Sequence, residues 1–360
     1  MFAARTDHLE SSPLYPLTSA ARVATGMGRN PLRRLALFEP DVVHVHNLFP
    51  NWGTRWLRSV RRPLVVTLHN YRIICAKGTL FRDGRICTAC PDGTPMSAVR
   101  YGCYRGSRVA TIPLAVANRR DLLEHPVVSS AKMVIVLNEV AREVYTRYGI
   151  PKDRLVVWPN FVGAEDDPGW SPVPSPESEW LYVGRLSEEK GILRLARAWP
   201  SDTPMLIIGD GPQRAAIEGA ARSKRIRVLG LQPTEVVRAS MQSAVGLVFP
   251  STCFENFPMV YAEAMASGLP VLAWEPNVVA AMVSQHGTGA VTTWDDDVAQ
   301  RVAGSSTVFR ELRGHCRRVF DHLLSEEAYV RRAEDLYGGL MAARGDASGR
   351  PPSATTPPAA

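Results

Sequence analysis

The stretch FPSTCFENFPMVYAEAMASGLPVLA, residues 249–273, is the most informative part of this 360-residue chain. Its pattern predicts a strand end, a loop, a buried helix that starts at Pro258 and stops at Gly268, and a second strand. Into this apolar setting the sequence places two carboxylates, Glu263 in the helix and Glu255 in the preceding loop. A buried carboxylate is costly unless something hydrogen-bonds to it. The pair therefore points to two hydroxyl-bearing parts of one extended ligand, against the alternative of a capping carboxylate and a chance polar residue.

Short apolar strands alternate with helices on both sides of this stretch, and that alternation predicts parallel α/β sheets. The expected strands cover residues 41–46, 64–68, 133–137, 155–158, 180–183, 205–208, 226–229 and 245–249. The expected helices cover residues 31–37, 114–123, 140–148, 192–198, 213–221, 234–239, 296–303, 306–313 and 326–340. The last of these is long and amphipathic and begins with a capping-box-like serine.

The length predicts two domains, and a proline-rich segment without periodicity marks the boundary between them. Residues 1–154 carry 23 Lys and Arg against 11 Asp and Glu, whereas the remainder carries 19 against 24. Two halves of opposite charge agree with two domains that have different partners. The expected division is an N-terminal domain at 1–163, a linker at 164–179, a C-terminal domain at 180–324, a returning helix at 325–342 and a disordered tail at 343–360.

The basic half suggests an anionic lipid surface, an anionic acceptor or a nucleic acid as partner, with a solvated basic surface as the alternative. Nucleic acid is disfavoured because the basic residues are scattered and no nucleic-acid motif accompanies them. No apolar run approaches the length of a membrane span, and no secretion signal opens the chain. The sequence therefore predicts a cytoplasmic protein whose six cysteines are reduced, with peripheral contact at the inner membrane face left open.

Two glycine-containing turns directly follow predicted strands of the second half. The first begins at Gly184 and contains Arg185 and Lys190, so a strand, a turn and a helix N-terminus form a natural anion site. Its two cations are suited to phosphate oxygens. The second contains Gly209 and Gly211, which permit close backbone approach. For both motifs the alternative is a simple turn before a solvent-exposed helix.

A histidine follows the end of a predicted strand in the first half. In open α/β sheets ligands bind at such carboxyl ends, so His69 is a candidate for contact with a ligand, against a purely structural hydrogen-bonding role. His44 and His46 are two residues apart on a strand and point the same way, toward the cleft or the acceptor. Two ligands are too few to indicate a metal.

Four cysteines lie within the loop-rich, basic segment 75–108, which we interpret as an insertion facing the acceptor. They are Cys75, Cys87, Cys90 and Cys103. The C-x2-C pair and its two flanking thiols are compatible with a structural zinc site, with disulfides or plain thiols as the alternatives. The aspartates at 295–297 begin a predicted helix, so we interpret them as helix-capping residues and not as a metal-binding D-x-D motif.

The order of Arg185, Lys190, Glu255 and Glu263 on their expected elements resembles the family 4 glycosyltransferases of the bacterial group 1 type. The resemblance runs from about residue 40 to residue 340. It implies the GT-B fold, α/β with two Rossmann-like domains facing a cleft, and the C-terminal domain as holder of a nucleotide-diphosphate sugar. It further implies retention of anomeric configuration, no catalytic metal and no other cofactor.

The resemblance also assigns roles. Glu263 is expected to hold the ribose hydroxyls, Glu255 and His69 to position the transferred sugar, and Arg185 and Lys190 to stabilise charge on the departing diphosphate. The remaining donor-binding residues implied by the resemblance are Gly184, Gly209, Gly211, Asn256, Phe257 and Pro258. The family often has Phe-Gly where this chain has Phe257-Pro258, so one donor N–H is lost.

Members of the family begin with a strand and a Gly-rich loop, and this chain lacks a matching segment. The expected N-terminal domain therefore lacks its first strand. The function implied is metal-independent transfer of a hexosyl group to an unknown acceptor, which is a glycan, a glycolipid or a secondary metabolite. Two alternatives stay open: a catalytically degenerate protein that binds a nucleotide sugar or a partner, and a sugar-nucleotide epimerase of the same fold.

Overall fold

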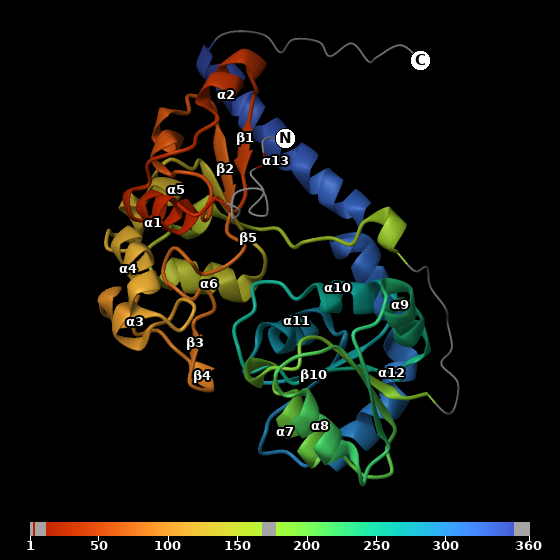
Figure 1. Ribbon diagram of the computed structural model, residues 1–360. Helices are drawn as coiled ribbons and strands as arrows, with labels where there is room; N and C mark the ends of the chain where they lie inside the picture. The colour runs from red at the N-terminus through yellow and green to blue at the C-terminus, as the bar shows by residue number, and fades with distance from the viewer. Residues whose placement is uncertain (1–2, 4–11, 168–177, 349–360) are drawn as a thin grey trace.

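The computed structural model describes residues 3, 12–167 and 178–348 (Figure 1). These residues form two α/β units, each built on its own parallel sheet. The C-terminal helix runs from the second unit back along the first (Figure 1). Within the described residues, no helix combines the length and the apolar character needed to cross a bilayer.

The N-terminal unit contains a four-stranded parallel sheet with the order β1-β2-β5-β6. The strands are β1 (Val43–Val45), β2 (Leu64–Thr67), β5 (Met133–Val136) and β6 (Leu155–Val157). All four lie within the predicted segments. Among residues 12–42 no strand precedes β1, and residues 4–11 lie outside the described part.

Helices and short turns surround this sheet. They are α1 (Tyr15–Thr25), α2 (Leu32–Phe38), η1 (Arg55–Ser59), α3 (Met96–Tyr101), α4 (Arg108–Ala117), η2 (Leu122–Glu124), α5 (Pro126–Ser129), α6 (Glu139–Arg147) and η3 (Lys152–Arg154). The predicted insertion also contains a small hairpin, β3 (Phe81–Arg82) and β4 (Arg85–Ile86). Helix α1 was not predicted, and none of its side chains is buried. The helix expected around 114–123 begins earlier, as α4, and ends at Ala117.

The C-terminal unit contains a six-stranded parallel sheet with the order β12-β11-β10-β7-β8-β9. Its strands are β7 (Trp180–Val183), β8 (Met205–Ile208), β9 (Ile226–Gly230), β10 (Leu247–Phe249), β11 (Val271–Trp274) and β12 (Gly289–Thr292). Its helices are η5 (Glu188–Lys190), α7 (Ile192–Ala198), α8 (Arg214–Ala221), α9 (Thr234–Ser243), α10 (Met259–Ala266), α11 (Val278–His286) and α12 (Val298–Val319). The predicted strands and helices between residues 180 and 274 are confirmed.

The structure corrects the sequence-based expectation after residue 274. Helix α11 and strand β12 were not predicted. The two helices expected at 296–303 and 306–313 are the single helix α12, which passes through a Gly-Ser-Ser sequence without a break. Ser306 is accommodated inside the helix because its hydroxyl donates to the carbonyl of Val302, one turn earlier and 2.9 Å away.

Helix α10 lies in the core of the second unit, as its apolar sequence predicted. Tyr261, Ala262, Ala264, Met265 and Ala266 are all buried. Pro258 was expected as the first helical residue, but it is the N-cap with an extended backbone (ψ 113°), and the helix begins one residue later. The helix ends as predicted, since Gly268 adopts the left-handed conformation (φ 60°) just after it.

The last helices join the two units. After α12 come η6 (Phe320–Leu324, a turn of π-helix) and α13 (Glu326–Ser348). Helix α13 lays Tyr329, Ala333, Leu336, Tyr337 and Leu340 against a buried cluster of Val65, Ile135 and Trp158 in the N-terminal unit. The predicted return of this helix is confirmed. It continues to Ser348, beyond the expected start of the tail at residue 343, and residues 349–360 lie outside the described part.

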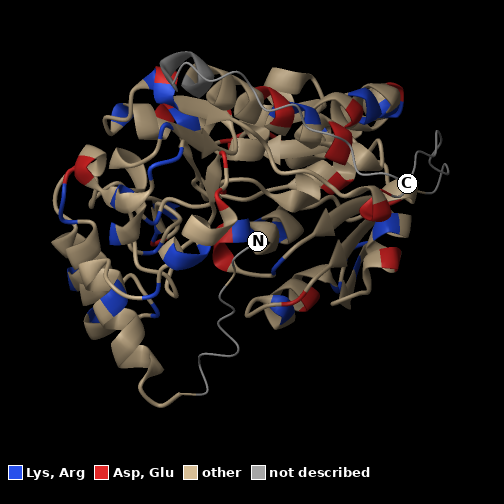
Figure 2. Cartoon of the chain, turned by 90° about the horizontal axis from the view of Figure 1, so that it is seen from above, with Lys and Arg blue, Asp and Glu red and all other residues tan. Residues whose placement is uncertain are grey.

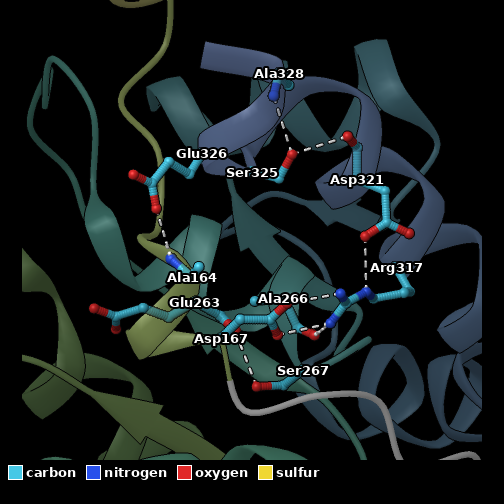
Figure 3. A network of polar contacts seen from close by, with 10 residues as sticks. All are labelled: Ala164, Asp167, Glu263, Ala266, Ser267, Arg317, Asp321, Ser325, Glu326 and Ala328. Atoms are coloured by element: carbon cyan, nitrogen blue, oxygen red, sulfur yellow. Dashed lines mark hydrogen bonds and ion pairs between the residues drawn. The ribbon is translucent and has the colours of Figure 1, made fainter. Parts of the chain in front are cut away.

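The beginning of the predicted linker is fixed to the C-terminal helices (Figure 3). It contains η4 (Ala164–Asp166), and residues 168–177 lie outside the described part. Arg317 binds both oxygens of Asp167, at 2.8 and 2.7 Å, and donates to the carbonyl of Ala266. Glu326 accepts a hydrogen bond from the backbone N–H of Ala164. Figure 3 shows these contacts converging where the chain leaves the first unit.

Candidate active site

Three loops meet at the carboxyl ends of β7, β8 and β10. The first two are joined by backbone hydrogen bonds from Gly184 N to Ile208 O (3.0 Å) and from Leu186 N to Asp210 O (2.9 Å). A Cβ atom on Gly209 would lie 1.9 Å from the carbonyl oxygen of Gly184, and one on Gly211 would lie 2.5 Å from that of Leu186. Close backbone approach therefore requires glycine at both positions.

The third loop is held against η5. The backbone N–H and the hydroxyl of Thr252 both donate to the carbonyl of Glu189, at 2.9 and 3.2 Å. Gly191 has φ 68°, and a Cβ there would lie 2.1 Å from the carbonyl oxygen of Pro250. The loop after β7 consequently presents Lys190 directly to the loop after β10.

Lys190 and Glu255 form an ion pair in this position. The lysine Nζ lies 2.7 Å from Glu255 Oε1, which also accepts a hydrogen bond of 2.9 Å from Ser251 Oγ. The two side chains are 24% and 18% exposed, so the pair is open to a ligand from one side. The sequence assigned both residues to one site but gave no sign of their direct contact.

Arg185 lies at the start of the same loop with an exposed side chain. Its carbonyl accepts a hydrogen bond from the Tyr182 hydroxyl, which fixes the backbone. Within the described part of the chain its guanidinium makes no hydrogen bond. Burial raises the pKa of the nearby Glu189, but hydrogen bonds from Ser187 and from its own backbone, then the charges of Lys190 and Arg185, lower it overall. The arginine is thus positioned with donors available beside Lys190.

Glu263 lies on α10, apart from the Lys190–Glu255 pair. Burial raises the pKa of its carboxyl group; Arg238 opposes this shift and Asp166 adds to it. Arg238 is itself paired with Asp166. Among the described residues the Glu263 carboxylate has no hydrogen-bond partner, and in Figure 3 it points away from Arg317. A half-buried carboxylate without a hydrogen-bond partner can accept hydrogen bonds from hydroxyl groups of a ligand.

Asn256 lies in the loop just before α10, and its side chain and carbonyl contact the N-terminal unit. Its side chain is buried, and Nδ2 donates to the carbonyl of Leu68 at the end of β2, 3.3 Å away. Its own carbonyl accepts from the side chain of Asn138 in the N-terminal unit. The residue therefore joins the two units next to His69. Phe257 is buried, and Pro258 caps α10.

The N-terminal unit contributes a cluster of three histidines. His46 Nδ1 and His69 Nε2 share a hydrogen bond of 2.9 Å, and the rings of His44 and His46 lie 4.2 Å apart. His44 was expected to face the cleft or the acceptor. Its ring nitrogens instead contact Tyr337 of α13 (2.5 Å) and Thr67 (2.7 Å), so its role is structural.

Burial keeps these histidines neutral. It lowers the pKa of His44 to about 3, with further lowering by His46 and His69. Burial, followed by the influence of His69, lowers the pKa of His46, and burial alone lowers that of His69. At neutral pH the His46–His69 hydrogen bond therefore joins two uncharged rings, one as donor and the other as acceptor.

The four cysteines of the insertion are free thiols in one neighbourhood. Burial raises the pKa of Cys90 to about 12, and the nearby thiols of Cys75, Cys103 and Cys87 add to the shift. Within the described residues no three His, Cys, Asp or Glu side chains are arranged to hold a metal ion. A zinc site at these cysteines stays a prediction, which metal analysis of the purified chain tests.

The aspartates before α12 have the capping role predicted for them. Asp297 accepts a hydrogen bond from the backbone N–H of Gln300 (3.1 Å). Asp296 accepts from the hydroxyl of Thr292 and from the N–H of Thr293, each at 2.9 Å. Both carboxylates are thereby used in the turn that starts the helix.

Two protein families match this chain. Residues 3–160 match the family described as "Glycosyl transferase 4-like domain", and residues 177–305 match "Glycosyl transferases group 1". Together they account for most of the chain. The gap between the two matches, residues 161–176, falls at the boundary between the two α/β units, so the sheet of each unit lies within one match.

Individual relatives agree with this assignment. TuaC of Bacillus subtilis strain 168, a glycosyltransferase provisionally assigned to teichuronic acid biosynthesis, is 25% identical over 262 residues, which are 69% of this chain and 56% of TuaC. The chain thus spans little more than half of that relative's length.

Two solved structures show the same architecture. Sucrose-phosphate synthase from Thermosynechococcus elongatus has a TM-score of 0.59 and 22% identity, and the alignment covers 95% of this chain and 81% of that one. Anabaena HepE in complex with UDP-glucose has a TM-score of 0.53 and 18% identity, with 91% and 83% covered. The architecture is the GT-B fold, as the sequence predicted.

Proposed function

The chain belongs to the group 1 glycosyltransferases with the GT-B fold, and we propose that it transfers a hexosyl group from a nucleotide-diphosphate sugar to an acceptor, with retention of anomeric configuration. The observation that carries this proposal is the Lys190–Glu255 ion pair beside the exposed guanidinium of Arg185. Two cations in the loop after β7 and a carboxylate in the loop after β10 suit a ligand with an anionic centre flanked by hydroxyl groups.

Lys190 and Arg185 bind the diphosphate of the donor. As the bond between the sugar C1 and the phosphate oxygen breaks, negative charge grows on that oxygen, and the two cations stabilise it. The two side chains supply the positive charge that a metal ion supplies in other reactions with a phosphate leaving group. We therefore propose that no catalytic metal is needed.

When the diphosphate attracts Lys190, the Oε1 atom of Glu255 becomes available for a hydroxyl group of the transferred sugar. Ser251 keeps the carboxylate in place through its 2.9 Å hydrogen bond. Glu263 accepts hydrogen bonds from the ribose hydroxyls, and the turns at Gly184, Gly209 and Gly211 form the backbone against which the nucleotide lies. That HepE was solved with UDP-glucose supports a nucleotide sugar as donor.

The acceptor hydroxyl attacks C1 from the face that the diphosphate leaves. The new bond joins the acceptor oxygen to C1, the C1–phosphate oxygen bond breaks, and the acceptor proton passes to the departing phosphate oxygen. No protein nucleophile or base takes part. His69, held by His46, orients the transferred sugar from the N-terminal side.

The test is a screen of the purified chain against a panel of nucleotide sugars, read first as a shift in melting temperature and then as release of nucleoside diphosphate. Binding without release or transfer for every donor and acceptor would identify a degenerate binding protein. Formation of an isomerised nucleotide sugar without any acceptor would identify an epimerase. Transfer that survives Lys190→Ala at the wild-type rate would overturn the assignment of the site.

A further inference from the structure

A cavity of about 170 Å³ opens in the N-terminal unit at the carboxyl ends of β1 and β2. His46 and His69 form part of its wall, so it begins where the proposed sugar site ends. Arginines from several segments also line it: Arg22, Arg55, Arg72, Arg119 and Arg120. No Asp or Glu is among its lining residues, within the part of the chain that the structure describes.

The two inner arginines are held in place by neutral groups. Arg72 Nη1 donates to the carbonyl of Ala76 at 3.0 Å, and its guanidinium lies 4.3 Å from the centre of the Phe49 ring. Arg22 Nη1 donates to the carbonyl of Pro50 at 3.3 Å. The Nε atoms of both are buried without a hydrogen-bond partner among the described residues. Their positive charges are therefore positioned but not neutralised.

The outer arginines Arg55, Arg119 and Arg120 are exposed, and within the described residues their guanidinium groups make no hydrogen bond or ion pair. The positive field reaches the cavity floor, where His125 has a pKa lowered to about 4 by burial, then by Arg120 and Arg58. Lys and Arg also outnumber Asp and Glu over the N-terminal unit, on the left of Figure 2. The cavity thus lies in the more basic of the two units and is itself lined by five arginines.

A second property of the cavity is its apolar wall. Leu48, Phe49, Trp52, Ile73, Leu114 and Val116 contribute to it. A ligand that matches the cavity combines an anionic group with an apolar or weakly polar body. Guanidinium groups bind phosphate through paired, charge-assisted hydrogen bonds. Several arginines that line one cavity can together bind the three oxygens and up to two negative charges of a phosphate. A single carboxylate offers them fewer oxygens and less charge.

We infer that this cavity is the acceptor site and that the acceptor carries a phosphate or diphosphate group, which Arg72, Arg119 and Arg120 bind. This inference rests on the proposed function, because the cavity becomes an acceptor site only beside a donor site. With the phosphate at the arginines, the acceptor hydroxyl lies toward His69. The phosphate belongs either to a soluble sugar phosphate or to a lipid-linked sugar.

The test is calorimetric titration of pyrophosphate into the full-length chain. Because pyrophosphate also suits the proposed donor site, the titration uses the Arg185→Gln/Lys190→Gln chain. We expect binding to persist there and to weaken at least about tenfold when Arg119→Gln/Arg120→Gln is added. Arg33→Gln/Arg61→Gln is the matched control, since it removes two exposed arginines of the same unit outside the cavity. Circular dichroism confirms that each chain is folded.

Equal affinity in the Arg119→Gln/Arg120→Gln chain, or an equal loss in the Arg33→Gln/Arg61→Gln control, overturns the inference. Two further arms locate the phosphate. The first is sedimentation with phosphatidylcholine vesicles that contain phosphatidic acid. If the chain sediments with these vesicles and the Arg119→Gln/Arg120→Gln chain does not, the phosphate belongs to a lipid. Pyrophosphate binding without vesicle binding assigns it to a soluble acceptor. Nucleotide-sugar hydrolysis is measured on the Arg119→Gln/Arg120→Gln chain, so failure of the donor site is recognised separately.

Discussion

Lys190 Nζ lies 2.7 Å from Glu255 Oε1, and this contact links the loop after β7 to the loop that precedes α10. The two residues satisfy each other while the site is empty of donor. A diphosphate competes for the lysine with more oxygens and more charge than one carboxylate offers. When the lysine leaves the glutamate for the diphosphate, both side chains become available to the donor. Lys190 then binds the phosphates, and Glu255 binds the sugar.

Lys190→Ala is expected to reduce transfer at least about a hundredfold, because a cation opposite the departing diphosphate is lost. The free energy of unfolding should fall by only about 1 kcal/mol or less, since the ion pair is partly exposed. Steady-state kinetics and urea unfolding measure the two effects. The control is Arg301→Ala, which removes a partly exposed ion pair to Asp296 away from the site. Wild-type turnover in Lys190→Ala contradicts the mechanism.

Glu263→Gln is expected to weaken nucleotide binding about tenfold, because a charged acceptor of hydrogen bonds from the ribose hydroxyls is lost. The informative measurement compares UDP with 2′-deoxy-UDP by calorimetry. Wild-type protein should prefer UDP, and the variant should bind both nearly equally. If the variant keeps the full preference, Glu263 does not contact the ribose.

Gly209→Ala is expected to lower the free energy of unfolding by at least about 2 kcal/mol, because its Cβ would lie 1.9 Å from the carbonyl of Gly184 at φ 143°. Donor binding should be lost as well. Gly219→Ala is the matched control: its Cβ meets nothing within 4 Å inside α8, and we expect a gain of about 0.5–1 kcal/mol. Two substitutions of equal effect would show that backbone approach is not what requires Gly209.

The pH dependence of stability should report His44. Its pKa is about 3 in the folded chain and about 6.5 when unfolded, so the unfolded state alone gains a proton as the pH falls below 6.5. Stability is therefore fully present above pH 6.5 and declines toward pH 3. In His44→Gln, which keeps polar contacts to Tyr337 and Thr67, this decline should be shallower. Identical melting profiles between pH 7 and 4.5 would exclude the effect.

Arg317→Lys should destabilise the chain by about 1–2 kcal/mol, because an ammonium group cannot bind both oxygens of Asp167 as the guanidinium does (Figure 3). A double-mutant cycle with Asp167→Asn isolates the pair from the bonds that Arg317 makes to Asp321 and Ala266. Additive effects in that cycle would show that the linker is held by other contacts.

Much of this fold was predictable because local patterns agree with it. Strand β10 and helix α10 are apolar, as their buried positions require, and Pro258 and Gly268 mark the two ends of the helix. Helix α11 and strand β12 were missed because residues 278–283 are all apolar and residues 287–292 are all small or β-branched, so neither period stands out. Two helices were predicted in place of α12 because Gly-Ser-Ser is a common helix break. In the fold Ser305 is buried by packing, and the helix continues through it.

The site was predictable as a set of residues but not as a set of contacts. Lys190 and Glu255 meet because Gly191 lets its backbone approach Pro250, and that approach depends on the tertiary structure. Asn256 binds the carbonyl of Leu68, which no pattern within either segment encodes. The arginine-lined cavity was also missed, since its arginines are scattered from residue 22 to residue 120 and gather only in the fold.

The return of α13 to the first unit has a consequence for synthesis. Val65, Ile135 and Trp158 are made early, but the side chains that cover them, from Tyr329 to Leu340, leave the ribosome almost last. Until then the nascent first unit presents an uncovered apolar face, which is the kind of surface that chaperones bind and that leads to aggregation. Completion of the first unit therefore waits for the second, and a chain released before residue 326 should accumulate as an insoluble product.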